Sequence, residues 1–201
     1  MQLNVYGAHR PQLSDSVKRC TVLFLANGAP TVQLAAREQM TGPRLVVAEA
    51  IEMWIRDSRD ELQQLLQRVD GFVLSASEAR QLTGEDRLVR AGMMIREMGP
   101  TFVVIKKAEH GAMFFSKHET YVLPAYPTPD VVDPTGAGDS FAGGMMGYLA
   151  QQGNFEPKTL KEAMAYGILV ASFTVEDFSL DRLRSIDRDD ITLRMERYKR
   201  M

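Results

Sequence analysis

Short runs of apolar and β-branched residues alternate with segments of helical period through the first half of the chain. The apolar runs have the length of buried strands and fall at 20–27, 44–50, 71–75 and 101–107. The segments between them predict helices at 31–40, 58–69, 77–83 and 86–98. This alternation favours a mostly parallel sheet with helices packed on its faces. We therefore expect an α/β protein with a three-layer α/β/α architecture.

Local signals mark the ends of these predicted helices. Ser58 and Glu61 have the spacing of a capping box, which predicts that the helix at 58–69 begins there. Gly84 and Gly99 follow the next two helical segments, where a glycine commonly ends a helix.

The pattern changes after Lys107. Two short apolar runs, 111–116 and 120–125, are separated by three polar residues and predict an antiparallel hairpin at the edge of the sheet. The rest of the chain predicts helices near 138–152, 158–175 and 187–200. No repeat or linker divides the sequence, so residues 1–201 are interpreted as a single domain.

Composition narrows the classes of protein and partner. Hydrophobic residues make up 45% and charged residues 25% of the 201, which are ordinary values for a globular protein. Lys and Arg number 24 against 26 Asp and Glu, so 24 − 26 gives −2 and no basic surplus favours nucleic acid or an anionic membrane. The single cysteine, Cys20, and a start without an apolar signal region favour the cytoplasm. No apolar run has the length of a membrane span.

A glycine-rich turn before the first C-terminal helix is the most informative stretch. Gly136 and Gly138 allow close backbone approach, so the amides around them are able to converge on an anion at the positive end of the helix. Asp139 would face that anion and is placed to accept a proton from an attacking hydroxyl.

Three alternatives compete for this turn. Asp139 is also a good helix N-cap, and the glycines alone would suit any tight turn. A dinucleotide-binding loop fits poorly, because Phe141 stands where that fingerprint needs a small residue. A Walker-type loop, with its G-x-x-x-x-G-K-[ST] pattern, occurs nowhere in the sequence.

The nine residues 133–141, DPTGAGDSF, resemble position for position the C-terminal signature of the PfkB carbohydrate kinases, the ribokinase-like sugar and nucleoside kinases. Two other segments are similar to motifs of that family in the same order: VDGFVLSASEARQLTG at 69–84 and VVIKKAEHGAMFF at 103–115. The resemblance implies a ribokinase-like fold whose N-terminal part and lid are missing from this chain. It also implies transfer of a phosphoryl group from ATP, with Mg²⁺, to a hydroxyl of a small sugar or nucleoside.

The resemblance implies functional roles for individual residues. It implies that Asp139 is the catalytic base and that the amides of Gly136, Ala137 and Gly138 form the anion hole. Glu78 falls on the family glutamate that positions Mg²⁺ through water, although a glutamate in the first turn of a helix is also favoured by the helix dipole.

Further positions match the family around the nucleotide and a second cation. Lys106 and Gly111 lie in the segment that flanks the nucleotide, and a lysine at a strand end is otherwise unremarkable. The small residues Gly167 and Ala171 match a helix that leaves room for adenine, or they serve helix packing. Asp133 and Thr135 match a region where family members bind a monovalent cation such as K⁺, or they stabilise the turn.

Departures from the family pattern support a second hypothesis. Ser75 replaces the asparagine of the N-x-x-E motif, Ala108 replaces a glycine, and Glu52 places a charge where relatives carry an amide. A chain that lacks the N-terminal region is expected to cover its exposed apolar surface by forming a homo-oligomer. The alternative function is therefore an inactive or weakly active nucleotide-binding or interaction module derived from a kinase.

Overall fold

The computed structural model describes residues 9–201. Most of the N-terminal segment on which the prediction of no secretory signal rests lies outside the described residues. Two compact units divide the chain: the first extends to Lys106 and includes Met113–Tyr121, and the second holds Lys107–Ala112 and Val122–Met201. Each unit is described by itself, and the single domain over 1–201 stays a prediction.

The sheet has six strands in the order of the sequence. They are β1 (Val22–Leu25), β2 (Leu45–Glu49), β3 (Gly71–Ser75), β4 (Phe102–Lys106), β5 (Ala112–Ser116) and β6 (Thr120–Leu123). The first four strands pair in parallel, and each lies within the apolar run that predicted it. The mostly parallel α/β sheet is thereby confirmed.

The last two strands are joined by three residues, a connection short enough only for an antiparallel pair. The Ser116 amide donates to the Glu119 carbonyl at 2.8 Å and closes the turn. Phe114 stacks between Phe102 and Tyr121, with ring centroids 5.7 and 4.6 Å away, so an aromatic ladder ties the hairpin to β4.

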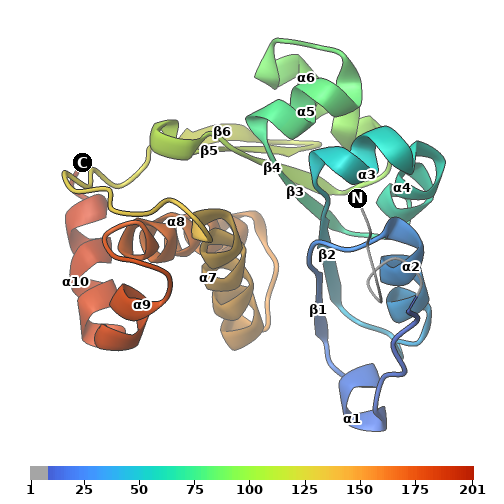
Figure 1. The fold of residues 1–201 in the computed structure, drawn as a ribbon, viewed down its shortest axis with the longest axis horizontal. Coiled ribbons are helices and arrows are strands. Elements are labelled where there is room, and N and C mark those ends of the chain that lie inside the picture. Colours follow the sequence, from blue (N-terminus) through green and yellow to red (C-terminus); the bar gives the residue numbers. More distant parts are fainter. Residues whose placement is uncertain (1–8) are drawn as a thin grey trace. The chain divides into compact units, whose positions relative to one another are not determined.

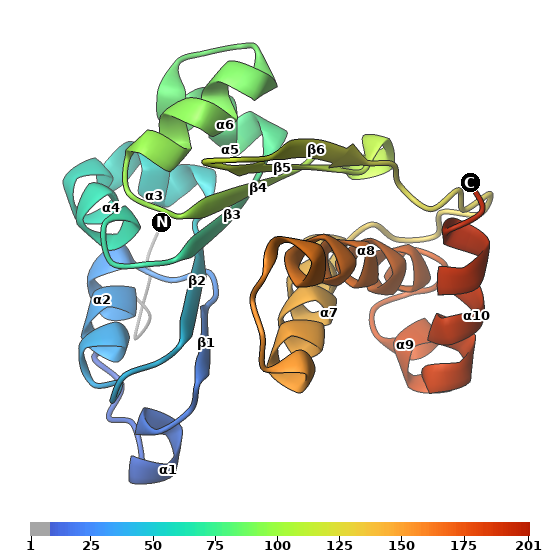
Figure 2. The same ribbon diagram turned by 180° about the vertical axis from the view of Figure 1, so that it is seen from behind.

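Helices of the first unit pack along one face of the parallel strands (Figures 1 and 2). These helices are α2 (Pro30–Glu38), α3 (Glu52–Asp57), α4 (Arg59–Leu66), α5 (Ala76–Thr83) and α6 (Leu88–Glu97), and a short α1 (Asp15–Lys18) precedes them. Alternate strand residues such as Phe72 and Leu74 meet Leu62, Leu66 and Ile95 of the helices in one buried cluster. The residues between them along each strand therefore point to the other face of the sheet. They include the last residues of β2, β3 and β4, which are Glu49, Ser75 and Lys106.

The predicted capping box at Ser58 is wrong. Ser58 precedes α4, but its side chain accepts no capping hydrogen bond. The reason is that Ser58 also ends α3, where its amide donates to the Trp54 carbonyl at 3.0 Å, and its backbone does not take the usual cap conformation. The capping box is formed instead by Ser75 and Glu78 at the start of α5.

The second unit contains four α-helices among its described residues, besides a short 3-10 helix at Ala108–His110. The α-helices are α7 (Ala137–Gln152), α8 (Pro157–Thr174), α9 (Asp181–Ser185) and α10 (Arg188–Tyr198). Three of them match predicted helices, whereas α9 follows a predicted break and was not expected. The two long helices, α7 and α8, lie side by side, and α9 and α10 pack against α8 (Figure 2). No helix among residues 9–201 is both long and apolar enough to cross a bilayer.

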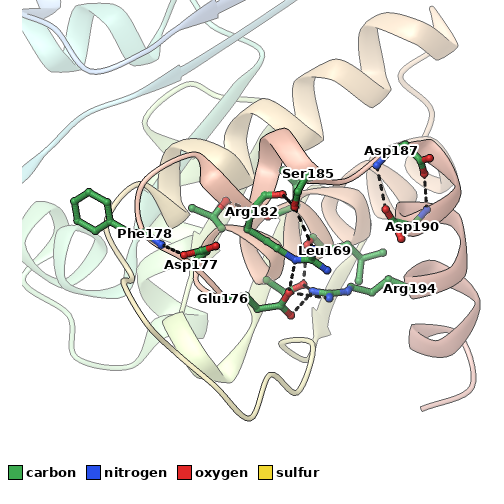
Figure 3. A network of polar contacts seen from close by, with 12 residues as sticks. Leu169, Glu176, Asp177, Phe178, Arg182, Ser185, Asp187, Asp190 and Arg194 are labelled. Carbon is green, nitrogen blue, oxygen red and sulfur yellow. Dashed lines mark hydrogen bonds and ion pairs between the residues drawn. The ribbon is translucent and has the colours of Figure 1, made fainter.

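A network of two arginines around Glu176 fixes α9 and α10 to the end of α8 (Figure 3). Arg194 of α10 lies 2.8 Å from the Glu176 carboxylate and donates to the Ser172 hydroxyl at 2.9 Å. Its guanidinium also lies 3.4 Å from the centroid of the Phe173 ring. Arg182 of α9 donates to the same carboxylate at 3.3 Å.

Replacing Arg194 by Ala is expected to lower the free energy of unfolding by about 2–3 kcal/mol, because Glu176 loses its closest partner in a mostly buried position. Arg194→Lys restores only a small part, since a lysine has neither the planar fork nor the stacking surface. Thermal melts check both variants against Arg197→Ala, an exposed residue of the same helix. Equal melting temperatures for the two alanine variants would contradict this role.

Candidate active site

The glycine turn leads directly into α7. Gly136 is the N-cap, with φ 80° and ψ −2°, a left-handed conformation that favours glycine. Asp139 is the third residue of the helix, and no side chain among residues 9–201 caps the helix. The alternative that Asp139 is the N-cap is therefore wrong, and its exposed carboxylate is left at the start of the helix.

Within the first turn of α7, two amides are open to an anion. The Ala137 amide donates to the Pro134 carbonyl at 3.2 Å, and the Ser140 amide to the Gly136 carbonyl at 2.9 Å. The amides of Gly138 and Asp139 have no backbone acceptor within residues 9–201. They lie in the first turn of a 16-residue helix, where the helix dipole favours negative charge. Of the three amides predicted for the anion hole, the Ala137 amide is engaged in the turn, whereas the amides of Gly136 and Gly138 donate to no acceptor among the described residues.

Asp133 stabilises the turn before this helix. Its Oδ1 accepts the Thr135 amide at 2.9 Å, and this hydrogen bond holds the pKa of the Asp133 carboxyl below its usual value. The amides of Val132 and Asp133 both donate to the Val175 carbonyl, so the loop is tied to the end of α8. These contacts fit the turn-stabilising interpretation of Asp133 and Thr135, and the predicted K⁺ site stays a prediction.

Gly167 lies at the contact between α7 and α8. A Cβ atom there would come within 2.7 Å of the Phe141 carbonyl oxygen and 3.1 Å of its ring. The residue is buried, whereas Ala171, one turn later, is partly exposed. These contacts fit the packing interpretation of Gly167, and the predicted room for adenine beside Gly167 and Ala171 stays a prediction.

We expect Gly167→Ala to lower the free energy of unfolding by about 2 kcal/mol, because α7 and α8 must separate to admit the methyl group. Gly147→Ala is the matched control on α7, where none of the described residues comes within 4 Å of the added Cβ. It is expected to raise stability by about 0.5–1 kcal/mol through helix propensity alone. Urea titrations of both variants test the contrast, and shifts of the same sign would refute it.

Glu78 and Lys106 belong to the first unit, at the carboxyl ends of β3 and β4. The Glu78 Oε2 accepts the Ser75 amide at 2.6 Å, and the Ser75 hydroxyl accepts the Glu78 amide at 3.2 Å. Glu78 Oε1 makes no hydrogen bond with the described residues. Lys106 is the neighbour of Ser75 in the register of β3 and β4, and its Nζ lies 3.9 Å from Glu49 Oε2.

Gly111 lies in the second unit, where a tight turn precedes β5. Its φ of 82° and ψ of −139° fall in a region that favours glycine. Ala108 begins the same turn with φ 50°, a strained conformation for a residue with a side chain. The departure from the family pattern at Ala108 thus falls at a position where glycine would relieve strain.

The groups in each unit fit the nucleotide and metal that the motifs imply. In the second unit, the two open amides of α7 suit a phosphoryl oxygen, and no atom of the described residues approaches within 4 Å of a Cβ built on Gly136. In the first unit, a lysine ammonium suits phosphate, and a free carboxylate oxygen suits a hydrated hard cation.

Sequence reasoning missed one polar residue at the same edge of the sheet. Glu49 ends β2, is only 7% exposed, and follows four apolar residues. The sequence did contain a signal for Glu49, because an acidic residue at the end of an otherwise apolar parallel strand indicates a ligand site. Ligands of α/β sheets bind at the carboxyl ends of the strands.

Comparison with known proteins shows similarity to kinases. The chain is 33% identical over 122 residues to a cytidine kinase of Thermococcus kodakarensis, covering 58% of this chain and 43% of that protein. It is 31% identical over 118 residues to an aminoimidazole riboside kinase of Salmonella typhimurium, covering 57% of this chain and 36% of that protein. The chain thus spans less than half the length of these relatives.

Solved structures show the same fold. The crystal structure of aminoimidazole riboside kinase from Salmonella enterica, complexed with aminoimidazole riboside and an ATP analog, matches with a TM-score of 0.74 at 22% identity. It covers 88% of this chain and 63% of that one. A putative ribokinase II from E. coli in complex with ATP and Mg²⁺ matches with a TM-score of 0.72 at 23% identity, covering 91% of this chain and 61% of that one. The expected ribokinase-like fold is confirmed.

The family model described as pfkB family carbohydrate kinase matches residues 32–184, which is most of the chain. This stretch includes the capped start of α5, the end of β4 and the glycine turn before α7. The protein therefore belongs to the pfkB family of carbohydrate kinases.

Proposed function

We propose that this chain carries out the transfer of the γ-phosphoryl group of ATP to a hydroxyl of a sugar or a nucleoside. The glycine turn carries the proposal, because it presents two open amides and an exposed Asp139 carboxylate at one helix start. The two similar proteins, a cytidine kinase and an aminoimidazole riboside kinase, support an acceptor of the sugar or nucleoside class.

The residue roles follow from the chemistry of phosphoryl transfer. Asp139 takes the proton of the acceptor hydroxyl as the hydroxyl oxygen bonds to the γ-phosphorus. The bond from that phosphorus to the bridging oxygen breaks, and ADP leaves with the electron pair. The amides of Gly138 and Asp139 stabilise negative charge on the transferred group. Mg²⁺, when bound, neutralises phosphate charge, and we assign Glu78 to its hydration shell and Lys106 to a phosphate oxygen.

A second candidate function is a nucleotide-binding or interaction module with little or no turnover. The observation that favours it is Ala108, whose methyl group stands at a positive φ in the turn where the family pattern has a glycine. K⁺ as a second cation, a homo-oligomer and a cytoplasmic location stay predictions from the sequence.

Calorimetry with MgATP, followed by an ADP-release assay, tests the proposal. The acceptor panel includes ribose, deoxyribose, cytidine, adenosine and aminoimidazole riboside. Acceptor-dependent release of ADP supports the kinase, and the acceptor with the highest kcat/KM identifies the substrate class. Binding of MgATP without turnover on any acceptor would support the module instead. A chain that binds no MgATP would refute both functions.

A further inference from the structure

A polar network joins the carboxyl ends of β1, β2 and β4 in the first unit. The Glu49 Oε1 accepts the amide of Asn27 at 3.1 Å, and its Oε2 lies 3.9 Å from Lys106 Nζ. The side-chain carbonyl of Asn27 accepts the indole N–H of Trp54 at 3.1 Å. We refer to Asn27, Glu49, Trp54 and Lys106 as the carboxyl-edge network.

The Lys106 side chain crosses β3 to reach Glu49. Strand β3 lies between β2 and β4, and neighbouring strands are about 4.8 Å apart. In the register of the sheet, Glu49 pairs with Val73, and Ser75 pairs with Lys106 two residues further along. Both charged side chains therefore lie on the face opposite to helices α2–α6, and the ammonium is drawn over the end of β3 instead of extending into solvent.

The Glu49 carboxylate is held in place independently of Lys106. The Asn27 amide fixes one of its oxygens, and the Gln33 side chain donates to the Glu49 backbone carbonyl at 2.9 Å. Gln33 also donates to the carbonyls of Leu25 and Ala26, which ties the end of β2 to the end of β1. The Glu49 carboxylate is therefore rigid, whereas the Lys106 side chain is flexible. The ammonium of Lys106 is held where it pairs with the carboxylate.

A mostly buried ion pair of this kind contributes little net stability, because removing both charges from water offsets their attraction. Its effect on the lysine is larger. A lysine has a flexible four-carbon stem, and ordering such a side chain on binding lowers affinity. A lysine already ordered at the carboxyl edge binds an anion without that loss.

We propose that Glu49 is a positioning residue that holds the Lys106 ammonium at the carboxyl edge, ready for the phosphate chain of a nucleotide. This rests on the proposed function, in which Lys106 contacts phosphate. Glu49 acts on the phosphate chain through Lys106, and Asn27 connects the pair to Trp54.

Trp54 supplies a direct readout, because it is the single tryptophan of the chain. Anion binding at Lys106 changes the field at Glu49 and Asn27, and the change reaches the indole through its hydrogen bond. Titration of MgATP without acceptor is followed by Trp54 fluorescence and by calorimetry, for the wild type, Glu49→Gln, Lys106→Met and the double variant. Gln keeps an acceptor for the Asn27 amide and replaces the charged carboxylate by a neutral amide of nearly the same shape.

Glu49→Gln is expected to raise the Kd for MgATP about fivefold, within the factor that ordering one long side chain costs on binding. Glu49→Asp, which keeps the charge on a shorter stem, is expected to give an intermediate Kd. In the Lys106→Met background, Glu49→Gln is expected to have no further effect. Glu85→Gln breaks the ion pair with Arg87 elsewhere on the first unit and serves as the control with an unchanged Kd.

An unchanged or lower Kd for Glu49→Gln would overturn the proposal, as would an equal effect with and without Lys106. The latter result is what a merely structural role of Glu49 predicts. If the wild type binds no MgATP, the proposed function fails, and inorganic triphosphate then tests the pair alone. A fluorescence response to triphosphate that needs both Glu49 and Lys106 sustains the positioning role, and its absence refutes it.

Discussion

Asp139→Asn is expected to lower kcat by about two to four orders of magnitude, which is the usual contribution of a general base. Asparagine has nearly the same shape but does not accept the proton of the acceptor hydroxyl. The Asp139 side chain is exposed and is not a capping side chain of α7 in the described part of the chain, so the substitution is expected to leave the fold intact. The Kd for MgATP is expected to stay within about twofold of the wild type, because the open amides of α7 are unchanged.

The measurement is the rate of ADP release at saturating acceptor, with the Kd taken from calorimetry on the same preparations. Asp130→Asn is the matched control, since Asp130 is an exposed aspartate in the segment leading to the same turn. It makes the same change of charge and is expected to keep the wild-type rate. A full rate in Asp139→Asn would remove Asp139 from the role of base.

The parallel strands were predictable because each is a short, nearly uninterrupted apolar run. All five residues of β2 are buried, and a strand buried on both faces leaves that pattern in the sequence. The helices α1, α3 and α9 were missed for a related reason. They have only four to six residues, too few to show a helical period.

Two serines, each followed three residues later by a glutamate, show that spacing alone does not predict a capping box. Ser58 and Ser75 have the same spacing to a glutamate, but only Ser75 forms the capping box. Ser58 is held by the end of the preceding helix, which its own sequence neighbourhood did not reveal. Ser75 was a departure from the family asparagine, yet serine and asparagine are similar N-caps, so the start of α5 is preserved.

The candidate site likewise has a part that the local sequence predicts and a part that depends on tertiary structure. The glycine turn is local in sequence, and its open amides follow from the conformation that Gly136 permits. The contact of Lys106 with Glu49 depends instead on strand order and register, which place residues from separate strands at one edge. Similarly, the close approach of Gly167 to Phe141 is set by helix packing that no pattern of residues specified.

Gly111→Ala is expected to lower the free energy of unfolding by at least about 3 kcal/mol, because backbone strain and a steric clash add. The φ of 82° with ψ of −139° disfavours any residue with a side chain. An added Cβ would also collide with the Leu123 carbonyl oxygen and lie 2.5 Å from the Pro124 carbonyl carbon. These are backbone atoms at the end of β6, and they cannot move without opening the hairpin.

Gly84→Ala separates the two contributions. Gly84 ends α5 with φ 70°, and no atom of residues 9–201 lies within 4 Å of its added Cβ. That variant is therefore expected to lose only about 1–2 kcal/mol, from backbone strain. Thermal and urea unfolding compare the two variants, and loss of folded Gly111→Ala protein agrees with the larger effect. A Gly111→Ala protein as stable as Gly84→Ala would refute the clash. The hairpin thus requires Gly111 on backbone grounds alone, whether or not the residue also contacts a nucleotide.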